Sequence, residues 1–301
     1  MNANLAQLFP GFNEFKIETE PGIEIHGIRG GDGPALLLLH GHPQTLAIWH
    51  TIATELAKKY TVIATDLRGY GDSSKPEGLP DHSNYSKRVM AQDQVKVMAQ
   101  LGFENFAVLA HDRGARVAHR LVRDYPQKVS RLMLLDIAPT LAMYEKTDRE
   151  FAQAYFHWFW YIQPAPLPET MMGSDPAFYI RTVMGNRNPG SSIFDPRAQS
   201  EYERCVSLPG AIHGFCEDYR ASAGIDLDHD RESIAQGQKI TCPLLVLWGA
   251  NGVVQRCFDP LAEWQAVATN VSGQSVPSGH YIVEEIPQVV LTKALDFFAK
   301  A

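Results

Sequence analysis

Short apolar runs recur along the chain and alternate with stretches of helical periodicity. The run Ala35–Leu39 is continuously apolar, and similar runs stand in "YTVIATDL", "FAVLA", "VSRLMLLDIA" and "CPLLVLWGA". Runs of this kind predict strands that are buried on both faces of a sheet. Two alternating strands in "FKIETEPGIEIHGIRG" precede them, and helical patterns cover Thr51–Tyr60, Tyr85–Leu101 and Arg113–Tyr125. The alternation predicts an α/β fold with a mostly parallel sheet and helices on both faces.

The alternation stops after Ile137 and resumes only at the buried run Cys242–Trp248. Residues 139–214 are aromatic and punctuated by proline, as in "QAYFHWFWYIQPAPLPETMMGSDPAFY". This stretch predicts a helical cap inserted into the order of the sheet, with a core made of residues 1–138 and 215–301. The end of the chain predicts a last strand near Gln274–Val276, the loop "PSGHY" and a helix from Glu284 to Lys300.

Composition narrows the class of protein. The N-terminus has no basic start followed by an apolar stretch, and no run reaches the roughly 18 apolar residues of a membrane span, so we expect a cytoplasmic protein without a membrane partner. A net charge of -7 argues against nucleic acid as a partner, and it means that an anionic substrate would need local positive charge. The four cysteines have no ligand spacing, so we expect free thiols and no metal. They are Cys205, Cys216, Cys242 and Cys257.

The segment "FAVLAHDRGARVAHRL" carries the strongest chemical signal. It reads as a strand, a sharp turn and a helix, with Asp112 at the turn and Gly114 two residues later. This is the form of a nucleophile elbow in which Asp replaces Ser, and it would leave the backbone N–H of Arg113 facing the reacting centre. An aspartate that merely caps the following helix is an equally common explanation for such a residue.

Two other segments change that balance. His280 lies in "PSGHYIVEEIP", between the last strand and the final helix, where the base of this chain order belongs. The loop "LLLLHGHPQT" follows an early strand and can present the backbone N–H of His42 as a second oxyanion donor beside that of Arg113. A single histidine is more often packed or solvated, but this joint order is much less expected by chance.

The order of the strands, the elbow and the late histidine resemble the α/β-hydrolase superfamily over nearly the whole chain. Within it, "HDRGAR", "FHW" and "DYR" resemble the fluoroacetate (haloacetate) dehalogenases. The resemblance implies an α/β-hydrolase fold with a helical cap and hydrolytic removal of halide from small 2-haloacids. It implies water as the second reactant, no cofactor, and a homodimer.

The type of nucleophile fits this chemistry. A carboxylate displaces a leaving group from saturated carbon better than it attacks a carbonyl carbon, and Asp112 is ionised at neutral pH without a base. His280 would then deprotonate the water that hydrolyses the aspartyl ester. Asp136, at the end of the run "LMLLD", is expected to orient His280, because Asn251 stands where the other position for this acid would be. Asp259 is a weaker alternative, and both acids could instead cap helices.

Two arginines follow the nucleophile. A carboxylate substrate would repel Asp112 by roughly 4 kcal/mol at 4 Å and an effective dielectric near 20. Arg113 and Arg116 lie on the first helical turn, where their planar forks could grip the substrate carboxylate and offset that repulsion. Apart from the resemblance, a pair of solvated or salt-bridged charges is the simpler explanation, and it is the one expected for Arg120 and Arg123.

The resemblance places the halide-binding donors on His157, Trp158 and Tyr219. Without it, His157 and Trp158 would be taken as part of an aromatic cap core. His42 departs from the family's usual "HGFP" pattern, so a titratable ring near the oxyanion donors is unexpected.

Two other functions remain open at this point. An epoxide hydrolase shares the Asp nucleophile, the histidine and the cap, but it polarises its substrate with cap tyrosines and has no need of arginines beside the Asp. A binding or receptor protein that lost turnover would keep the fold, although a complete Asp112–His280–Asp136 triad argues against it.

Overall fold

The computed structural model describes residues 1–187 and 193–299. Residues 188–192, inside the predicted cap, and residues 300–301, at the end of the predicted core, lie outside the described residues. Among the described helices, none combines the length and the apolar character needed to cross a membrane.

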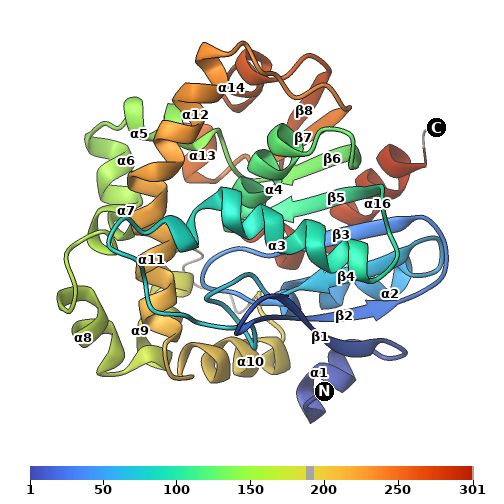
Figure 1. The fold of residues 1–301 in the computed structure, drawn as a ribbon, viewed down its shortest axis with the longest axis horizontal. Helices are drawn as coiled ribbons and strands as arrows, with labels where there is room; N and C mark the ends of the chain where they lie inside the picture. The colour runs from blue at the N-terminus through green and yellow to red at the C-terminus, as the bar shows by residue number, and fades with distance from the viewer. Residues whose placement is uncertain (188–192, 300–301) are drawn as a thin grey trace.

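One sheet organises the chain (Figure 1), and its strands follow the order β1-β2-β4-β3-β5-β6-β7-β8. The pairs β1–β2 and β2–β4 are antiparallel, and the remaining pairs are parallel, which confirms the mostly parallel sheet. The strands are β1 (Asn13–Glu20), β2 (Ile23–Gly30), β3 (Ala35–Leu39), β4 (Thr61–Thr65), β5 (Phe106–His111), β6 (Val129–Leu135), β7 (Leu244–Gly249) and β8 (Val271–Val276).

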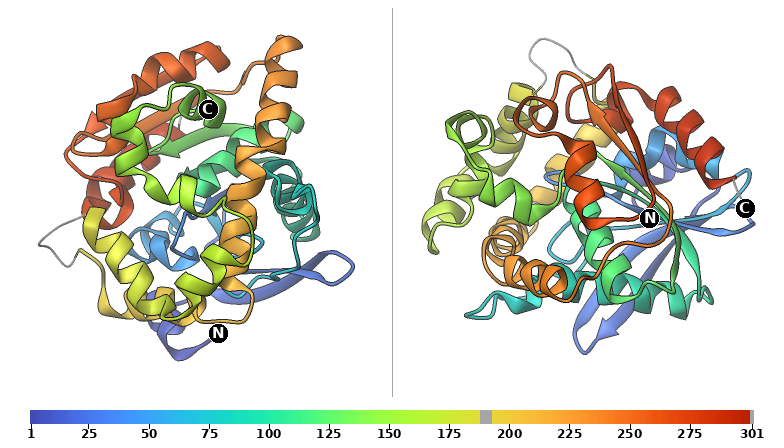
Figure 2. Two further views of the ribbon diagram at one scale, coloured as in Figure 1. Left: turned by 90° about the vertical axis from the view of Figure 1, so that its left-hand side faces the viewer. Right: turned by 90° about the horizontal axis from the view of Figure 1, so that it is seen from above.

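Helices cover both faces of the sheet (Figures 1 and 2): α3 and α4 pack together on one face, and α2 and α16 lie on the other. The core helices are α1 (Ala3–Leu8), α2 (Ala53–Leu56), α3 (Lys87–Gln100), α4 (Asp112–Asp124), α13 (Val253–Cys257), α14 (Pro260–Val267), α15 (Ile282–Glu285) and α16 (Pro287–Phe298), with the 3-10 helices η1 (Leu46–Thr51) and η2 (Ser83–Tyr85).

A second group of helices connects β6 to β7 and lies beyond the carboxyl ends of the central strands (Figure 1). It consists of α5 (Thr140–Glu145), α6 (Arg149–Ala154), α7 (Phe156–Trp160), α8 (Leu167–Gly173), α9 (Pro176–Arg187), α10 (Pro196–Val206), α11 (Ala211–Ala223) and α12 (Ile225–Ala235). The expected division between residues 214 and 215 falls within α11. The exact domain boundary stays a prediction.

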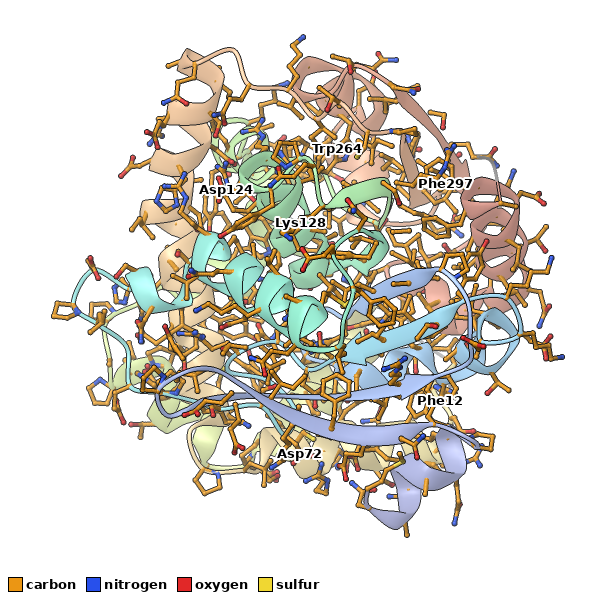
Figure 3. The ribbon with its side chains drawn as sticks, turned by 45° about the vertical axis from the view of Figure 1, so that its right-hand side comes forward. Phe12, Asp72, Asp124, Lys128, Trp264 and Phe297 are labelled. Carbon is orange, nitrogen blue, oxygen red and sulfur yellow. The ribbon has the colours of Figure 1, made fainter. Side chains whose placement is uncertain are left out.

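Apolar side chains fill the space between the sheet and its helices (Figure 3), where Trp264 of α14 and Phe297 of α16 are labelled. The strands β3 and β4 are buried along their whole length. Continuous burial on both faces explains why these strands read as unbroken apolar runs.

Two helices differ from the sequence expectation. The segment expected as Thr51–Tyr60 holds only the short α2, because Ile52 leaves helical geometry between η1 and α2. The final helix is divided into α15 and α16 at Ile286, which precedes Pro287 and has an extended φ of -138°. A residue before proline is disfavoured in the helical region, so the division follows from local sterics.

Candidate active site

Asp112 lies at the sharp turn between β5 and α4. Its φ is +46°, in the left-handed region that residues other than glycine rarely adopt. Two glycines make the turn possible: a Cβ on Gly41 would lie 2.4 Å from the Cβ of Asp112, and one on Gly114 would lie 2.3 Å from the carbonyl oxygen of His40. The expected elbow is therefore present in the backbone.

Oriented donors and positive charge surround the carboxylate of Asp112. The backbone N–H of His42 donates to its Oδ1 at 2.8 Å, and Nε2 of His280 lies 3.9 Å from its Oδ2. Burial opposes ionisation, but interactions with His280 and His111 and the positive charges of Arg113 and Arg116 outweigh burial and hold the pKa of Asp112 well below its usual range. Asp112 is thus a carboxylate at neutral pH, as a nucleophile requires.

His280 and Asp136 meet at the carboxyl ends of the strands. Nδ1 of His280 donates to Oδ2 of Asp136 at 2.6 Å, and the N–H of Gly249 donates to Oδ1 at 2.9 Å. With its proton on Nδ1, the ring presents the lone pair of Nε2 toward Asp112, and no protein group within the described chain forms a hydrogen bond to Nε2. Asp259 instead accepts a hydrogen bond from Ala262 at the start of α14.

Arg113 is buried beneath the cap helix α11. Its Nε donates to Asp218 at 2.7 Å, and its Nη2 donates to Asp218 and to Ser222. The guanidinium carbon lies 4.0 Å from the ring centroid of Tyr219. Most of the fork is therefore occupied by protein groups, which differs from the expected open fork.

Arg116 is held in a similar way. Its Nη1 donates to Ala138 and Thr140, its Nη2 contacts the sulfur of Met143, and its guanidinium lies over the ring of Trp158. Within the described chain, Nη1 of Arg113 and Nε of Arg116 are buried without a hydrogen-bond partner. Each arginine therefore offers one unpaired nitrogen, with two N–H groups on Nη1 of Arg113 and one on Nε of Arg116, rather than a bidentate fork.

Of the three side chains expected to bind halide, Tyr219 contacts Arg113 and Trp158 contacts Arg116. His157 and Trp158 come from α7 and Tyr219 from α11, and all three are buried. The ring centroids of His157 and Tyr219 lie 5.8 Å apart, and those of Trp158 and Tyr219 lie 6.2 Å apart. The ring of His42 joins the group, with its Nε2 3.0 Å from the hydroxyl of Tyr161.

Comparison with known proteins fits this geometry. A family model described as the alpha/beta hydrolase fold matches residues 34–284. The chain belongs to the α/β-hydrolase fold family. A fluoroacetate dehalogenase from Burkholderia sp is 43% identical over 295 residues, which cover 98% of this hydrolase and 96% of that protein.

Two further relatives show which other activities occur among similar proteins. A soluble epoxide hydrolase from Corynebacterium sp. (strain C12) is 34% identical over 92% of this hydrolase and 94% of that protein. The crystal structure of ALR0039 from Nostoc sp PCC 7120, considered an alpha/beta hydrolase, has a TM-score of 0.93 and 53% identity over 96% of this hydrolase and 99% of that chain. The expected family is confirmed, and both dehalogenase and epoxide hydrolase relatives lie within it.

Sequence reasoning missed the residue that fixes Arg113 in this hydrolase. Asp218 of α11 pairs with Arg113 and Lys87 and accepts the hydroxyl of Tyr70 at 2.6 Å. Burial opposes its ionisation, but Arg113 and Lys87 outweigh burial and lower its pKa. The available signal was the spacing of Asp218 and Ser222, four residues apart on one helical face.

Two clusters of the hydrolase have the residue types of a metal site. They are His26, Asp66 and Asp72, and Asp72, Glu201 and Cys205. Arg204 already binds both Asp72 and Glu201, and His26 lies between two carboxylates as a hydrogen-bonded partner. These contacts pair the polar side chains of both clusters without an ion, so we assign neither cluster a role in catalysis.

Proposed function

We propose that this hydrolase removes halide from small 2-haloacids such as fluoroacetate or chloroacetate, with glycolate as the organic product. The observation that carries the proposal is an ionised aspartate at the elbow near two buried arginines, each of which has one guanidinium nitrogen without a partner in the described chain. The fluoroacetate dehalogenase relative supports it.

The first step is displacement at the α-carbon. A carboxylate oxygen of Asp112 attacks the carbon, an ester bond forms, and the carbon–halogen bond breaks with its electron pair leaving on halide. The N–H groups of Arg113 and Arg116 hold the substrate carboxylate and offset a repulsion of roughly 4 kcal/mol. N–H and O–H donors of His157, Trp158 and Tyr219 stabilise the departing halide, which matters most for fluoride because it leaves poorly.

The second step is hydrolysis of the Asp112 ester. His280 takes a proton from water through Nε2 while the water oxygen attacks the ester carbonyl carbon. The backbone N–H groups of His42 and Arg113 would stabilise the oxyanion, and Asp136 would stabilise the positive ring of His280. Release of glycolate regenerates Asp112.

Halide release tests the reaction directly. Purified protein is incubated with fluoroacetate or chloroacetate, and free halide and glycolate are measured, with Asp112→Asn as the control. We expect release by the wild type and at least a thousandfold loss in the variant, because an amide is a poor nucleophile. No release from either substrate, or full activity in Asp112→Asn, would reject the proposal.

Isotope incorporation tests the ester. In a single turnover in oxygen-18 water, the label should enter the Asp112 carboxylate, and the glycolate hydroxyl should carry an unlabelled oxygen from Asp112. Direct entry of label into glycolate would show that water attacks the substrate without an ester.

Epoxide hydrolysis is an alternative reaction for the same triad, and the similarity to the Corynebacterium epoxide hydrolase supports it. In this case His157, Tyr219 or the cap tyrosines Tyr155 and Tyr161 would polarise the epoxide oxygen. A neutral epoxide gives no reason to place two buried guanidinium groups beside the nucleophile. Faster turnover of styrene oxide than of chloroacetate would favour this alternative.

A further inference from the structure

A cavity of about 200 Å³ borders His280. Its wall combines the cap residue Tyr155 with residues of the loop after β7 and of α13, namely Asn251, Gly252, Val253 and Arg256. Asn251 and Arg256 are exposed, so the cavity opens to solvent. His280 forms its inner wall, and Asp112 is not among its lining residues.

The proposed hydrolysis of the Asp112 ester requires water next to His280. Each turnover consumes one water molecule at Nε2 of His280, yet the surrounding site is closed. Asp112 is 5% exposed, Arg113 is 0% exposed and Tyr219 is 1% exposed. Water therefore has to reach His280 through a gap in this packing.

The cavity has the capacity and the polarity to hold that water. Its volume corresponds to several water molecules, since one occupies roughly 30 Å³ in the liquid. The hydroxyl of Tyr155 lies 3.4 Å from Nδ1 of His280, and the Asn251 amide and the Arg256 guanidinium add polar groups to the wall. Gly252 places this wall beside the triad, since a Cβ on it would lie 3.4 Å from Oδ1 of Asp136.

The charges at the mouth suit water better than an anionic substrate. Arg256 of α13 is paired with Glu150 of α6 at 3.2 Å, and both side chains are about half exposed. This pair leaves little net positive charge to attract a carboxylate. Water is uncharged, so the hydrogen-bonding groups of the cavity wall are sufficient to hold it.

We propose that this cavity supplies the water that hydrolyses the Asp112 ester, an inference that rests on the proposed function. One water proton passes to Nε2 of His280, and the hydroxyl oxygen forms a bond to the ester carbonyl carbon. The bond from that carbon to the alkyl oxygen then breaks, and this oxygen takes the proton from His280 to become the glycolate hydroxyl. The regenerated Asp112 loses the remaining proton to solvent.

Filling the cavity should slow the second step and leave the first intact. Val253→Phe adds a ring to the wall without removing a polar group, and Val253→Leu adds a smaller volume. With chloroacetate, we expect a burst of one halide per active site, followed by steady turnover about tenfold slower in Val253→Phe and by a smaller decrease in Val253→Leu. Rapid quenching and mass spectrometry should find the carboxymethyl ester on Asp112.

Val289→Phe in α16 is the matched control, because it enlarges a partly buried valine outside the cavity. It should turn over like the wild type. Wild-type turnover in Val253→Phe, or equal slowing of the burst and the steady phase, would overturn the water-supply proposal while leaving dehalogenation intact. Absence of halide release from the wild type would instead reject the proposed function. If Val253→Phe does not fold, the same rate comparison is made with Val253→Leu.

Discussion

Asp112 and Asp136 share an unusual backbone feature. Both have positive φ, +46° and +51°, at the ends of the adjacent strands β5 and β6. Strained conformations of this kind persist where the surrounding structure holds them and cluster at functional sites. The carboxylates contact the groups that orient them: the His42 N–H binds Asp112, and the Gly249 N–H binds Asp136.

Substitution of the arginines separates charge from geometry. Arg113→Lys and Arg116→Lys keep a positive charge but remove the planar guanidinium group and its unpaired nitrogen. We expect kcat/KM for chloroacetate to fall about 10- to 100-fold in each variant, the equivalent of one lost charge-assisted hydrogen bond.

The control for these variants is Arg120→Lys. Arg120 is also buried on α4, but it pairs with Asp124. It should lose stability at most, with activity per folded molecule retained. Unchanged turnover in Arg113→Lys or Arg116→Lys would show that the arginine concerned does not bind the substrate.

Glu284 gives a pH-dependent prediction. It is buried between Gln44 and Tyr202, whose hydroxyl donates to it at 2.9 Å. Burial raises the pKa of Glu284 to about 8. The folded protein keeps the proton on Glu284 up to this pKa, whereas the unfolded chain loses it above about pH 4.5. The free energy of unfolding therefore falls as pH rises from about 4.5 to 8.

Glu284→Gln removes that decrease. Relative to the wild type, the free energy of unfolding of the variant should rise by as much as about 1.4 kcal/mol for each pH unit across this window. Urea unfolding at pH 5, 6.5 and 8 measures it, with the exposed Glu232→Gln as control. Parallel pH profiles for wild type and Glu284→Gln would contradict the prediction.

The sequence was informative about residues that follow buried strands. Asp112, Asp136 and His280 each stand directly after a strand or in the loop that follows one, so strand assignment also located them. Asp218 and Glu284 gave no such signal, because an acid within a helix is usually a solvated residue. Their burial depends on which helices meet in space, and that is set by tertiary packing.

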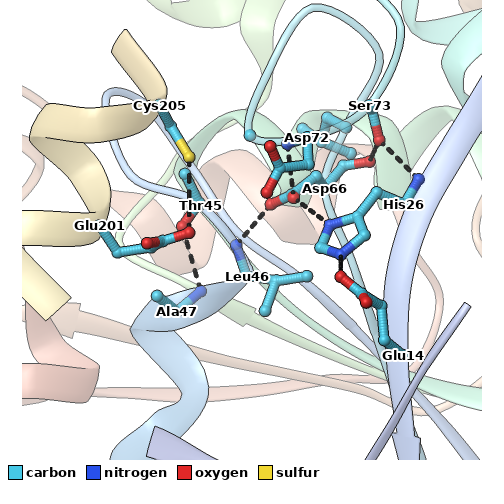
Figure 4. A network of polar contacts seen from close by, with 12 residues as sticks. Glu14, His26, Thr45, Leu46, Ala47, Asp66, Asp72, Ser73, Glu201 and Cys205 are labelled. Atoms are coloured by element: carbon cyan, nitrogen blue, oxygen red, sulfur yellow. Dashed lines mark hydrogen bonds and ion pairs between the residues drawn. The ribbon is translucent and has the colours of Figure 1, made fainter. Parts of the chain in front are cut away.

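At the scale of elements, one buried network joins β1, β2 and the loops after β3 and β4 (Figure 4). His26 contacts Asp66 at 2.6 Å and Glu14 at 2.9 Å, and Asp66 also accepts the N–H of Leu46 at 2.8 Å. Leu46 follows the loop that carries His42. The network therefore anchors the end of the loop that carries His42.

This network should make stability depend on pH. Burial opposes a charge on His26, but Asp66 and Glu14 outweigh burial and raise its pKa. The stabilisation is then fully present below about pH 6.5 and is lost as pH rises through the raised pKa. In urea unfolding, His26→Gln should cost more stability at pH 6 than at pH 9. An equal cost at both pH values would mean that the ring is neutral in the folded state.

The elements themselves were predictable where burial is uniform. The strands β3, β5, β6 and β7 were found from continuous apolar runs, because both faces of a central parallel strand are covered. β8 lies at the edge of the sheet and is largely exposed, so only part of it was found. Helix ends were less certain, since they depend on local sterics such as those at Ile286.

At the scale of the molecule, we expect a homodimer. Large exposed apolar side chains lie on the cap helices α7, α8 and α9, at Phe156, Leu167, Met171 and Phe178. Homodimers bury apolar surfaces of this kind. Light scattering should give twice the mass of one chain, and Met171→Glu should shift the protein toward the monomer. A wild type with the mass of one chain would reject this expectation.

The ion pair between Arg113 and Asp218 also limits how the enzyme can open. It joins α4 beside the nucleophile to α11 of the cap, and both side chains are fully enclosed. Lifting α11 away as a rigid lid would break this buried pair and the pair between Asp218 and Lys87 at the same time. Reactants and products should therefore be exchanged by small rotations of side chains around a cap that stays closed.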